Sequence, residues 1–412
     1  MKSFLITMQT VILFIFISVE LSAQWTQVLP SQNGSIFALK LKGTLNFFAG
    51  SDESGVFRTT DNGENWTTVN SGLTDLRVHS LVVNGTSLFA GTLGGVFLST
   101  DNGTSWTAVN SGLTNLNIYP LAVSGMNLFA GTSSSGVFLS TDNGTSWTAV
   151  NSGLTNLEVN ALAVNETNIF AGTNGGVFLS TDNGTSWTAA NSGLTNLLTD
   201  CFAVNGTNLF VGTYGGGVFL STDNGTSWTA INSGLSNLNL LSLFAVDGTN
   251  ILAGTDGDGV FLSTDNGSSW TAINSGLTDL SVLSFAVVGT DLFAGTSGGS
   301  SNGAWRRPLS EIIASVKETT LNHIPDKYLL GQNYPNPFNP STKIKYSIPQ
   351  SSNVKIEVYD IIGNSIETLI NKEQPAGTYE LTWYAGGLPS GIYFYQLSAG
   401  DFISTKKMIL MK

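Results

Sequence analysis

The feature that most constrains the fold of this chain is an eight-residue motif that recurs along most of its length. STDNGTSW stands at residues 99–106 and returns unchanged at 140–147, 180–187 and 221–228, with near copies TTDNGENW at 59–66 and STDNGSSW at 263–270. The aspartates of successive copies are 40, 41, 40, 41 and 42 residues apart. A period near 40 with four short β-like runs in each unit is typical of a β-propeller blade.

One unit, residues 78–116, contains the four runs in readable form. They are HSLVV, SLFAG, GVFLS and WTAVN, separated by Asn-Gly or glycine-rich turns. The second and third runs are apolar throughout, as expected of a sheet that neighbouring blades cover on both faces.

The number of runs predicts seven blades. The first run of a blade begins near Ile36, His79, Tyr119, Asn160, Asp200, Ser242 and Leu283. The tryptophan that opens the fourth run is Trp25, Trp66, Trp106, Trp147, Trp187, Trp228 or Trp270. The two series are offset, so the N-terminal run WTQVL is expected to complete the last blade and close a ring over residues 24–309. The alternative is an open solenoid.

Each residue type in the motif suits a tight turn between the third and fourth strands. Aspartate accepts hydrogen bonds from backbone N–H groups, and glycine adopts the conformation that such a turn requires. We therefore assign structural roles to the motif's aspartates and tryptophans, which are Asp61, Asp101, Asp142, Asp182, Asp223, Asp265, Trp66, Trp106, Trp147, Trp187, Trp228 and Trp270.

The pattern Ser/Thr-x-Asp-x-Gly-x-Ser/Thr-Trp resembles the Asp-box, or BNR, repeat of sialidases, xyloglucan-degrading propellers, sortilin-like receptors and photosystem II assembly-factor-like proteins. The resemblance implies a propeller whose boxes lie at the blade periphery, and it implies little about activity. Sialidases bind the substrate carboxylate with several arginines. The arginines here are Arg58, Arg77, Arg306 and Arg307, and the last two, being adjacent, point to opposite faces of one strand, so sialidase activity is not expected.

Charge excludes further classes of partner. The formal net charge is -12, and Lys and Arg are absent from Val78 to Trp305 while thirteen Asp and Glu are present there. Such a segment repels phosphate backbones and anionic lipid, so nucleic-acid binding is not expected. A single cysteine, Cys201, allows no intrachain disulfide.

Divergent positions point to one face of the ring. The turns between first and second strands scarcely change, whereas the loops between second and third strands and the residues that begin each first strand vary. Because strands alternate in direction, both variable sets emerge on the same face, where tyrosines could stack on sugar rings. The candidate binding residues are His79, Tyr119, Asn160, Asp200, Tyr214, Ser242, Asp256 and Asp258. Neutral drift in loops is the alternative explanation.

The expected function is therefore non-catalytic binding of a polysaccharide or a surface protein, with no catalytic residue, cofactor or metal ion. The alternative is a glycoside hydrolase or lyase for a neutral polysaccharide, which needs two carboxylates about 5–10 Å apart. Glu158, Asp200, Asp256 and Asp258 lie in loops that could supply them. The run DGDG at 256–259 suits calcium in its oxygen ligands but is too short to supply a full set.

The N-terminus has the composition of a secretory signal peptide. Lys2 precedes an apolar run from Phe4 to Val19, and Ala23 offers a small residue for cleavage, so residues 1–23 are expected to be removed. A membrane anchor is the alternative, although the run is short. The mature chain is expected to have no transmembrane segment and to be a monomer.

After a linker at 310–327, alternating runs such as 343–348 and 354–359 predict a small Ig-like antiparallel β-sandwich at 328–412. The expected fold class is thus all-β, a seven-bladed propeller followed by this sandwich. The terminal strand FISTKKMILMK is expected to expose an edge that a receptor could extend.

Residues 328–412 closely resemble the type A sorting domain of the type IX secretion system of Bacteroidetes and related bacteria. The resemblance rests on the segment NYPNPFNP, the predicted hairpin GLPSGIY and the Lys-Lys-Met end. It implies that the outer-membrane secretion machinery is a partner, and that the cargo is released or attached to the surface of a Gram-negative cell. The alternative is a carbohydrate-binding Ig-like domain. The sorting residues implied are Gly387, Pro389, Gly391, Tyr393, Lys406 and Lys407.

Overall fold

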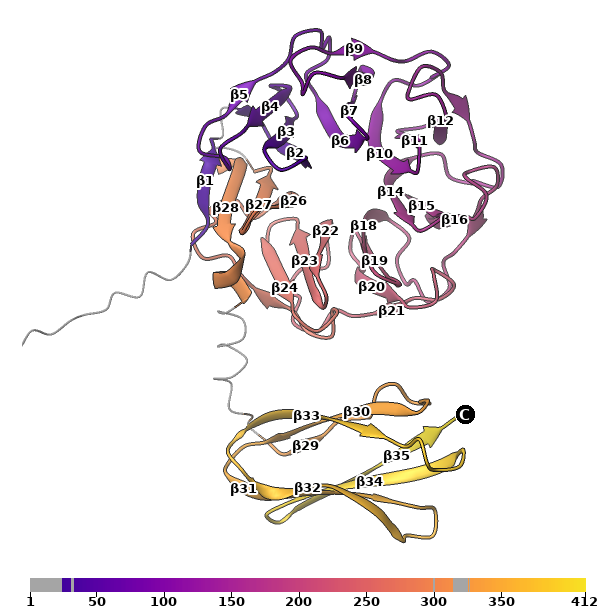
Figure 1. The fold of residues 1–412 in the computed structure, drawn as a ribbon, viewed down its shortest axis with the longest axis vertical. Coiled ribbons are helices and arrows are strands. Elements are labelled where there is room, and N and C mark those ends of the chain that lie inside the picture. The colour runs from indigo at the N-terminus through magenta and orange to yellow at the C-terminus, as the bar shows by residue number, and fades with distance from the viewer. Residues whose placement is uncertain (1–23, 31–32, 299–300, 314–324, 326) are drawn as a thin grey trace, which may run out of the picture. The chain divides into compact units, whose positions relative to one another are not determined.

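The computed structural model describes residues 24–30, 33–298, 301–313, 325 and 327–412 (Figure 1). The chain divides into two units, Met1–Ile313 and Ala314–Lys412, which are described separately. The expected signal peptide at 1–23 lies outside the described residues, as does most of the expected linker. Within the described part of the chain, none of the helical segments is both long enough and apolar enough to cross a membrane.

The first unit is a ring of seven four-stranded antiparallel sheets, which confirms the seven-bladed propeller (Figure 1). Within each blade, the first strand lies nearest the centre of the ring and the fourth strand lies at the outside (Figure 1). Blades 1 to 3 are β2(Ile36–Lys42), β3(Asn46–Ser51), β4(Val56–Thr59) and β5(Thr67–Thr68); β6(Val78–Asn84), β7(Ser87–Thr92), β8(Gly95–Ser99) and β9(Thr107–Ala108); and β10(Ile118–Ser124), β11(Asn127–Thr132), β12(Val137–Ser140) and β13(Thr148–Ala149).

The next three blades repeat this order. They are β14(Val159–Asn165), β15(Asn168–Thr173), β16(Gly176–Ser180) and β17(Thr188–Ala189); β18(Thr199–Asn205), β19(Asn208–Thr213), β20(Gly217–Ser221) and β21(Thr229–Ala230); and β22(Leu240–Asp247), β23(Asn250–Thr255), β24(Val260–Ser263) and β25(Thr271–Ala272).

Blade 7 combines the two ends of the propeller sequence. Its inner strands are β26(Val282–Val288), β27(Asp291–Thr296) and β28(Gly303–Pro308), and its outer strand is β1(Thr26–Leu29). The pairing is antiparallel, with Thr26 opposite Arg306. A short helical segment at 309–313 follows β28. Because β1 supplies the missing outer strand, the ring closes without an unpaired edge at this blade.

The core of the propeller lies between adjacent blades. In β7 every residue is buried, because one face of the sheet packs on the preceding blade and the other on the following one. One such cluster joins Phe48 and Val56 of blade 1 to Val78, Leu88 and Phe97 of blade 2. The continuous apolar runs of the repeat are thus explained by cover on both faces.

Tryptophans connect each of six blades to the blade before it. The indole N–H of Trp106, at the start of the fourth strand of blade 2, donates a 2.7 Å hydrogen bond to the carbonyl of Val69 in blade 1. The same bond, at 2.7–2.8 Å, joins Trp147 to Val109, Trp187 to Val150, Trp228 to Ala190, Trp270 to Ile231 and Trp25 to Ile273. The tryptophan of the motif therefore links blades as well as packing beside its own turn.

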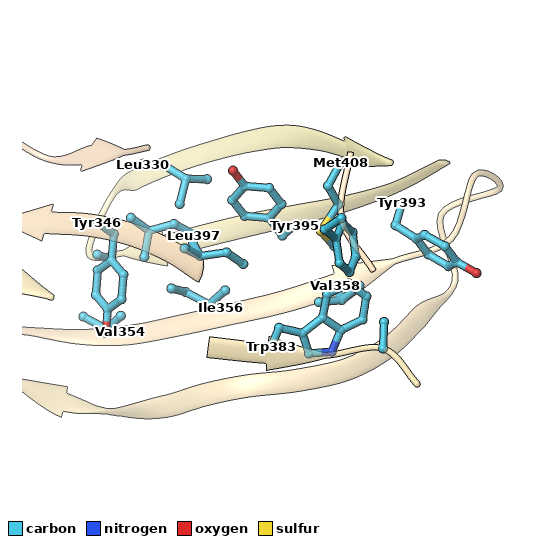
Figure 2. Close-up of a cluster of buried hydrophobic side chains, with 14 of the residues drawn as sticks. Leu330, Tyr346, Val354, Ile356, Val358, Trp383, Tyr393, Tyr395, Leu397 and Met408 are labelled. Carbon is cyan, nitrogen blue, oxygen red and sulfur yellow. The ribbon is translucent and has the colours of Figure 1, made fainter. Parts of the chain in front are cut away.

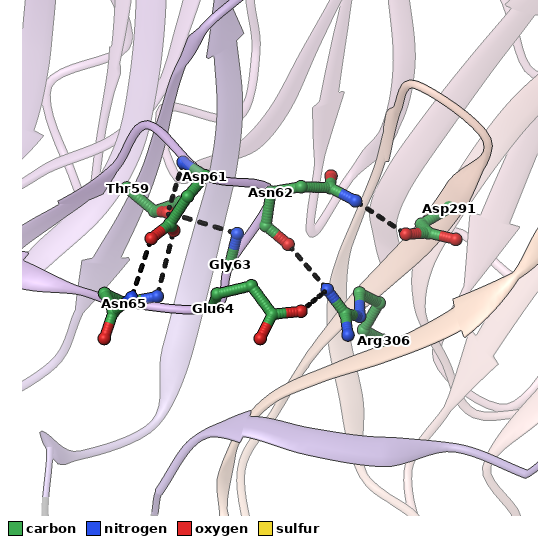
Figure 3. Close-up of polar contacts among 8 residues, drawn as sticks. All are labelled: Thr59, Asp61, Asn62, Gly63, Glu64, Asn65, Asp291 and Arg306. Carbon is green, nitrogen blue, oxygen red and sulfur yellow. Dashed lines mark hydrogen bonds and ion pairs between the residues drawn. The ribbon is translucent and has the colours of Figure 1, made fainter.

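The joint between blades 7 and 1 uses different contacts (Figure 3). The indole nitrogen of Trp66 is buried and has no hydrogen-bond partner among the described residues. Instead Arg306 of blade 7 donates to the carbonyl of Asn62 at 3.0 Å and to the carboxylate of Glu64 at 2.9 Å. The side-chain amide of Asn62 donates to Asp291 at 2.6 Å. Hydrogen bonds to the Asp-box turn of blade 1 therefore join blade 7 to blade 1, where the ring closes.

The second unit is a β-sandwich with a three-stranded sheet, β29-β30-β33, and a four-stranded sheet, β32-β31-β34-β35. Its strands are β29(Leu329–Leu330), β30(Ser341–Ile348), β31(Ser352–Tyr359), β32(Ser365–Gln374), β33(Gly377–Tyr384), β34(Gly391–Ala399) and β35(Phe402–Leu410). Side chains from both sheets, including Ile356, Trp383 and Tyr395, form one buried cluster (Figure 2). The alternation of apolar and polar residues along these strands is explained because each sheet packs one face against the other sheet and exposes the opposite face.

The GLPSGIY segment was predicted to be a hairpin, and this is wrong. β33 pairs with β30 in one sheet, whereas β34 pairs with β31 and β35 in the other, so residues 385–390 cross between the sheets. The hydroxyl of Tyr393 donates to the carbonyl of Pro389 at 2.8 Å and holds this crossing.

The tryptophan joints yield a test of stability. Replacing Trp187 with Phe keeps an aromatic ring but leaves the half-buried carbonyl of Val150 without its donor, which should lower the free energy of unfolding by roughly 1–3 kcal/mol. Trp66→Phe is the matched control, since its indole nitrogen has no partner to lose among the described residues. Urea unfolding followed by circular dichroism measures both, and equal losses would contradict the role given to the indole bond.

Candidate functional site

A β-bulge in the inner strand of every blade builds the central mouth of the ring. The register of the first strand against the second shifts once near its start, for example between Val78 and Ser80 in blade 2. Such a bulge leaves one residue unpaired and turns its side chain away from the ladder. The shifts place a half-buried residue of each blade at this position, namely Phe37, His79, Tyr119, Asn160, Asp200, Leu241 and Leu283.

Ser242 was assigned to this mouth, and the structure contradicts that assignment. The bulge in blade 6 falls between Leu240 and Ser242, so Leu241 takes the bulged position. Ser242 is buried, and its hydroxyl donates to the carbonyl of Val282 in blade 7 at 2.8 Å. The alignment of the blade 6 sequence with the other blades was wrong by one residue, and a shift of one residue moves a side chain to the opposite face of its strand.

Blades 1 to 3 give the mouth an aromatic side. The rings of Phe37 and His79 lie 4.6 Å apart between centroids, and those of His79 and Tyr119 lie 5.3 Å apart. One ring nitrogen of His79 lies 3.6 Å from the carboxylate of Asp52. Burial nevertheless lowers the pKa of His79, so the imidazole is neutral at pH 7. Three consecutive blades thus present a continuous, uncharged aromatic surface.

Blades 4 and 5 give the mouth a polar side. The side-chain amide of Asn160 donates to Asn174 at 2.9 Å, to the carbonyl of Thr199 at 3.2 Å and to the carboxylate of Asp200 at 3.4 Å. Burial raises the pKa of Asp200 to about 6. Lys and Arg are absent from the sequence of these blades, so no side-chain cation there offsets the desolvation of this carboxylate.

The loops between second and third strands in blades 5 and 6 carry three further candidate residues, two of which are in contact. The hydroxyl of Tyr214 donates to the carboxylate of Asp256 at 3.2 Å, and this bond is the main reason why the pKa of Tyr214 is raised. Asp256 also accepts a 3.0 Å bond from Ser281. Asp258 instead accepts a 2.5 Å bond from Ser236. The two aspartates of DGDG therefore use different partners.

No group of three or more His, Cys, Asp or Glu side chains positioned to hold a metal ion occurs among the described residues. The arginines of the propeller do not form a converging set either. Arg58 donates to the carbonyl of Asn102 and Arg306 to that of Asn62, each in the following blade's box. Arg77 is paired with Asp75. Arg307 is buried and donates to the carbonyl of Ile273 at 3.0 Å.

The Asp-box is a closed hydrogen-bonded turn. Asp101 accepts from the Ser99 hydroxyl at 2.8 Å, from the Ser105 backbone N–H at 2.9 Å and from the Ser105 hydroxyl at 2.6 Å. Asn102 and Gly103 have φ of 58° and 83°, in the left-handed region that favours these residue types. A Cβ on Gly103 would lie 3.2 Å from the ring of Phe48 in the preceding blade, so this position touches its neighbour directly.

These bonds define the electrostatics of the box. Hydrogen bonds, chiefly from Ser105, lower the pKa of Asp101 to about 2, and bonds led by that from Thr59 lower the pKa of Asp61 to about 2 (Figure 3). An aspartate that accepts three hydrogen bonds from its own turn and has a lowered pKa is poorly suited to act as a base or an acid near neutrality.

In the sandwich, the terminal strand was expected to be a free edge, and this is wrong for its second half. β35 pairs with β34 on one side. On the other side the Asn-Pro segment lies against it: the backbone N–H of Phe338 donates to the carbonyl of Ile409, and that of Met411 donates to the carbonyl of Phe338, both at 2.9 Å. The carbonyl of Lys407 accepts a 2.7 Å bond from Gln332. Lys407 itself is exposed and Lys406 is half-buried.

Comparison with known protein families gives two matches. Residues 22–162 and 126–230, which together span half of the chain, match the family described as the DUF6242 beta propeller domain. Residues 332–411 match the secretion system C-terminal sorting domain. No significant match was found among curated proteins.

Solved structures with similar folds include enzymes and other propellers. YCF48 from Cyanidioschyzon merolae has 15% identity and a TM-score of 0.56, covering 70% of this chain and 99% of that one. PorZ, a surface component of the type IX secretion system of Porphyromonas gingivalis, has 17% identity and a TM-score of 0.55, covering 93% of this chain and 60% of PorZ. A GH74 xyloglucanase from Xanthomonas campestris has 15% identity and a TM-score of 0.56, covering 79% of this chain and 59% of the enzyme. At these identities the likeness shows the fold alone.

The lowered pKa values of the box aspartates predict acid sensitivity. A carboxyl whose pKa falls from 3.8 to about 2 on folding stabilises the native state above pH 4, and that stabilisation is lost as the pH drops from about 4 to about 2. The melting temperature of the propeller should therefore fall over this interval. Asp101→Asn should lower it at pH 7 and weaken its dependence on acid. An unchanged pH profile would contradict the assignment.

Proposed function

Because the chain belongs to the DUF6242 beta propeller domain family and ends in a secretion system C-terminal sorting domain, we propose that a type IX secretion system exports it and that it acts outside the cell as a non-catalytic binding scaffold. The proposed location is the surroundings or outer surface of a Gram-negative bacterium of the Bacteroidetes-related group. The ligand, a polysaccharide or a surface protein, is bound over the central mouth of the propeller.

The observation that carries this proposal is the diversity of the bulge positions in an otherwise repetitive ring. The joints between blades reuse the same Asp, Gly and Trp, because each joint has the same geometry to satisfy. The bulge positions carry Phe, His, Tyr, Asn, Asp and Leu in turn. These side chains are half-buried at the mouth, where the ring does not impose one residue type, so a ligand better explains their variety than packing does.

The aromatic and polar sides of the mouth suit a neutral sugar chain. The face of Tyr119 offers a surface for stacking, and Tyr214, 41% exposed beside Asp256, offers a second ring with polar groups at its edge. Asn160 and Asp200 supply amide and carboxylate groups for hydroxyls. Sialic acid and other anionic sugars fit poorly, since blades 2 to 6 contain no Lys or Arg.

A polysaccharide array probed with the mature chain tests this placement. Replacing Tyr119 and Tyr214 together with Ala should weaken binding by about tenfold, as expected for the loss of two stacking contacts. Met126→Ala is the control, because Met126 is exposed in a turn on the opposite face of the ring. Binding that is the same for the tyrosine variant and the wild type would contradict the placement at the mouth.

The pKa of Asp200 favours a second candidate function, a glycosidase for a neutral polysaccharide. A carboxyl with a pKa of about 6 keeps roughly a tenth of its population protonated at pH 7, far more than an ordinary aspartate, and can protonate a leaving group. The same array, scored for new reducing ends, separates the two functions. Sugar release that Asp200→Asn abolishes would favour the enzyme, whereas binding without release favours the scaffold.

Export by the sorting domain is tested by localisation in a host with a type IX secretion system. Deleting residues 402–412 should leave the protein in the periplasm, but it also removes Met408 and Leu410 from the sandwich core. A second variant with Lys406 and Lys407 changed to Ala keeps that core and should reduce the amount at the surface or in the medium. Wild-type export of the truncated chain would contradict the sorting role.

A further inference from the structure

An arc of exposed leucines surrounds most of the propeller mouth. One leucine stands two residues before the inner strand of each of blades 2 to 6, on the loop arriving from the previous blade. These side chains are 37–42% exposed, and we call them the leucine arc: Leu76, Leu116, Leu157, Leu197 and Leu238. The inner strands that follow them, β6, β10, β14, β18 and β22, succeed one another around the centre of the ring (Figure 1). The arc therefore borders the mouth on the face of the variable loops.

The fold uses the backbone of these leucines and leaves their side chains partly exposed. The carbonyl of Leu76 accepts from Gly55, that of Leu157 from Gly136 at 2.9 Å, and that of Leu238 from Gly217 at 3.0 Å. These bonds tie the arriving loop to the loop between second and third strands, and any side chain permits them.

The same loop carries an earlier leucine with a clear structural role. Leu154, for example, is 6% exposed and packs in the cluster between two blades. The second leucine of each loop is repeated without such a contact. Within the described propeller, the exposed large apolar side chains outside this face are Leu45 and Met126, which lie in turns on the other face. Exposed apolar side chains that recur on one face and stand beside polar groups indicate an interaction surface.

The charge around the arc identifies the kind of partner. Asp52, Glu158, Asp256 and Asp258 lie in loops on this face, and Asp200 lies inside the mouth. Blades 2 to 6 contribute no Lys or Arg, and Arg77, beside Leu76, is neutralised by Asp75. The propeller of a second copy would bring the same negative charge, and an anionic lipid surface would be repelled. A partner with both apolar and cationic side chains satisfies the leucines and the acids together.

We propose that the leucine arc and the acids of the mouth bind a basic amphipathic segment of another protein. The inference rests on the proposed binding function and names the partner class that this face fits. Apolar side chains of the partner lie on the leucines, and its Lys or Arg side chains reach the acids beside them.

A synthetic helical peptide with one leucine face and one lysine face, about 18 residues or five turns long, is a suitable probe. Binding to the mature chain is measured by fluorescence anisotropy. Leu116→Ser, Leu157→Ser and Leu197→Ser combined should raise Kd by about tenfold or more, because three apolar contacts are lost. The control, Leu45→Ser with Met126→Ser, removes apolar side chains from the opposite face and should leave Kd unchanged. Circular dichroism and melting establish that both variants are folded.

Two further peptides separate the contributions. A peptide with serine in place of leucine retains the charge and should bind at least about tenfold more weakly, and one with glutamate in place of lysine should not bind. Equal affinity for the serine peptide, or for the folded leucine variant, would overturn the proposal. If the probe fails while polysaccharide binding through Tyr119 and Tyr214 persists, this inference falls and the proposed function stands. If neither ligand binds, both fall.

Discussion

The antiparallel pairing of β1 with β28 is the constraint on which the propeller depends. It brings Thr26 opposite Arg306 and gives blade 7 its fourth strand. Without it β28 would be left as an unpaired edge, and blades 1 and 7 would be joined only by the packing and polar contacts of their inner strands and of the blade 1 box. The seam also differs from the other six joints, because among the described residues it lacks the tryptophan bond and has the bonds from Asn62 to Asp291 and from Arg306 to Glu64 (Figure 3).

In the closed ring, the residues at the joints between blades repeat from blade to blade, whereas the residues at the central mouth do not. The Asp-boxes lie at the joints of neighbouring blades, where identical geometry favours identical residues, and the box aspartates accept hydrogen bonds within their own turns, as Asp101 does. The bulged residues of the inner strands meet at the mouth, where the ring imposes no common side chain. The Ser, Asp and Thr of the motif therefore have a structural role. The side chains that could bind a ligand are those at the mouth of the ring.

Much of the fold could be predicted because short sequence patterns, repeated along the chain, specify its strands and turns. The period, the number of blades and the all-β sandwich follow from apolar runs and turn residues. Ser242 was misplaced because the run LLSLFAV does not reveal where a bulge falls. GLPSGIY was taken for a hairpin because two strands adjacent in sequence need not pair in the same sheet. The free edge of β35 was overestimated because Phe338, more than seventy residues away in sequence, covers it.

The sequence by itself determined the blade, since each blade is a short segment whose turns, buried runs and box depend on neighbours in the chain. It also determined the charge of the face, because blades 2 to 6 contain no basic residue. The tertiary structure decided which side chains meet. The alignment of Phe37, His79 and Tyr119, the contact of Tyr214 with Asp256 and the exposure of the leucine arc depend on bulges and on the circular arrangement of blades. These are long-range properties, and no local pattern encodes them.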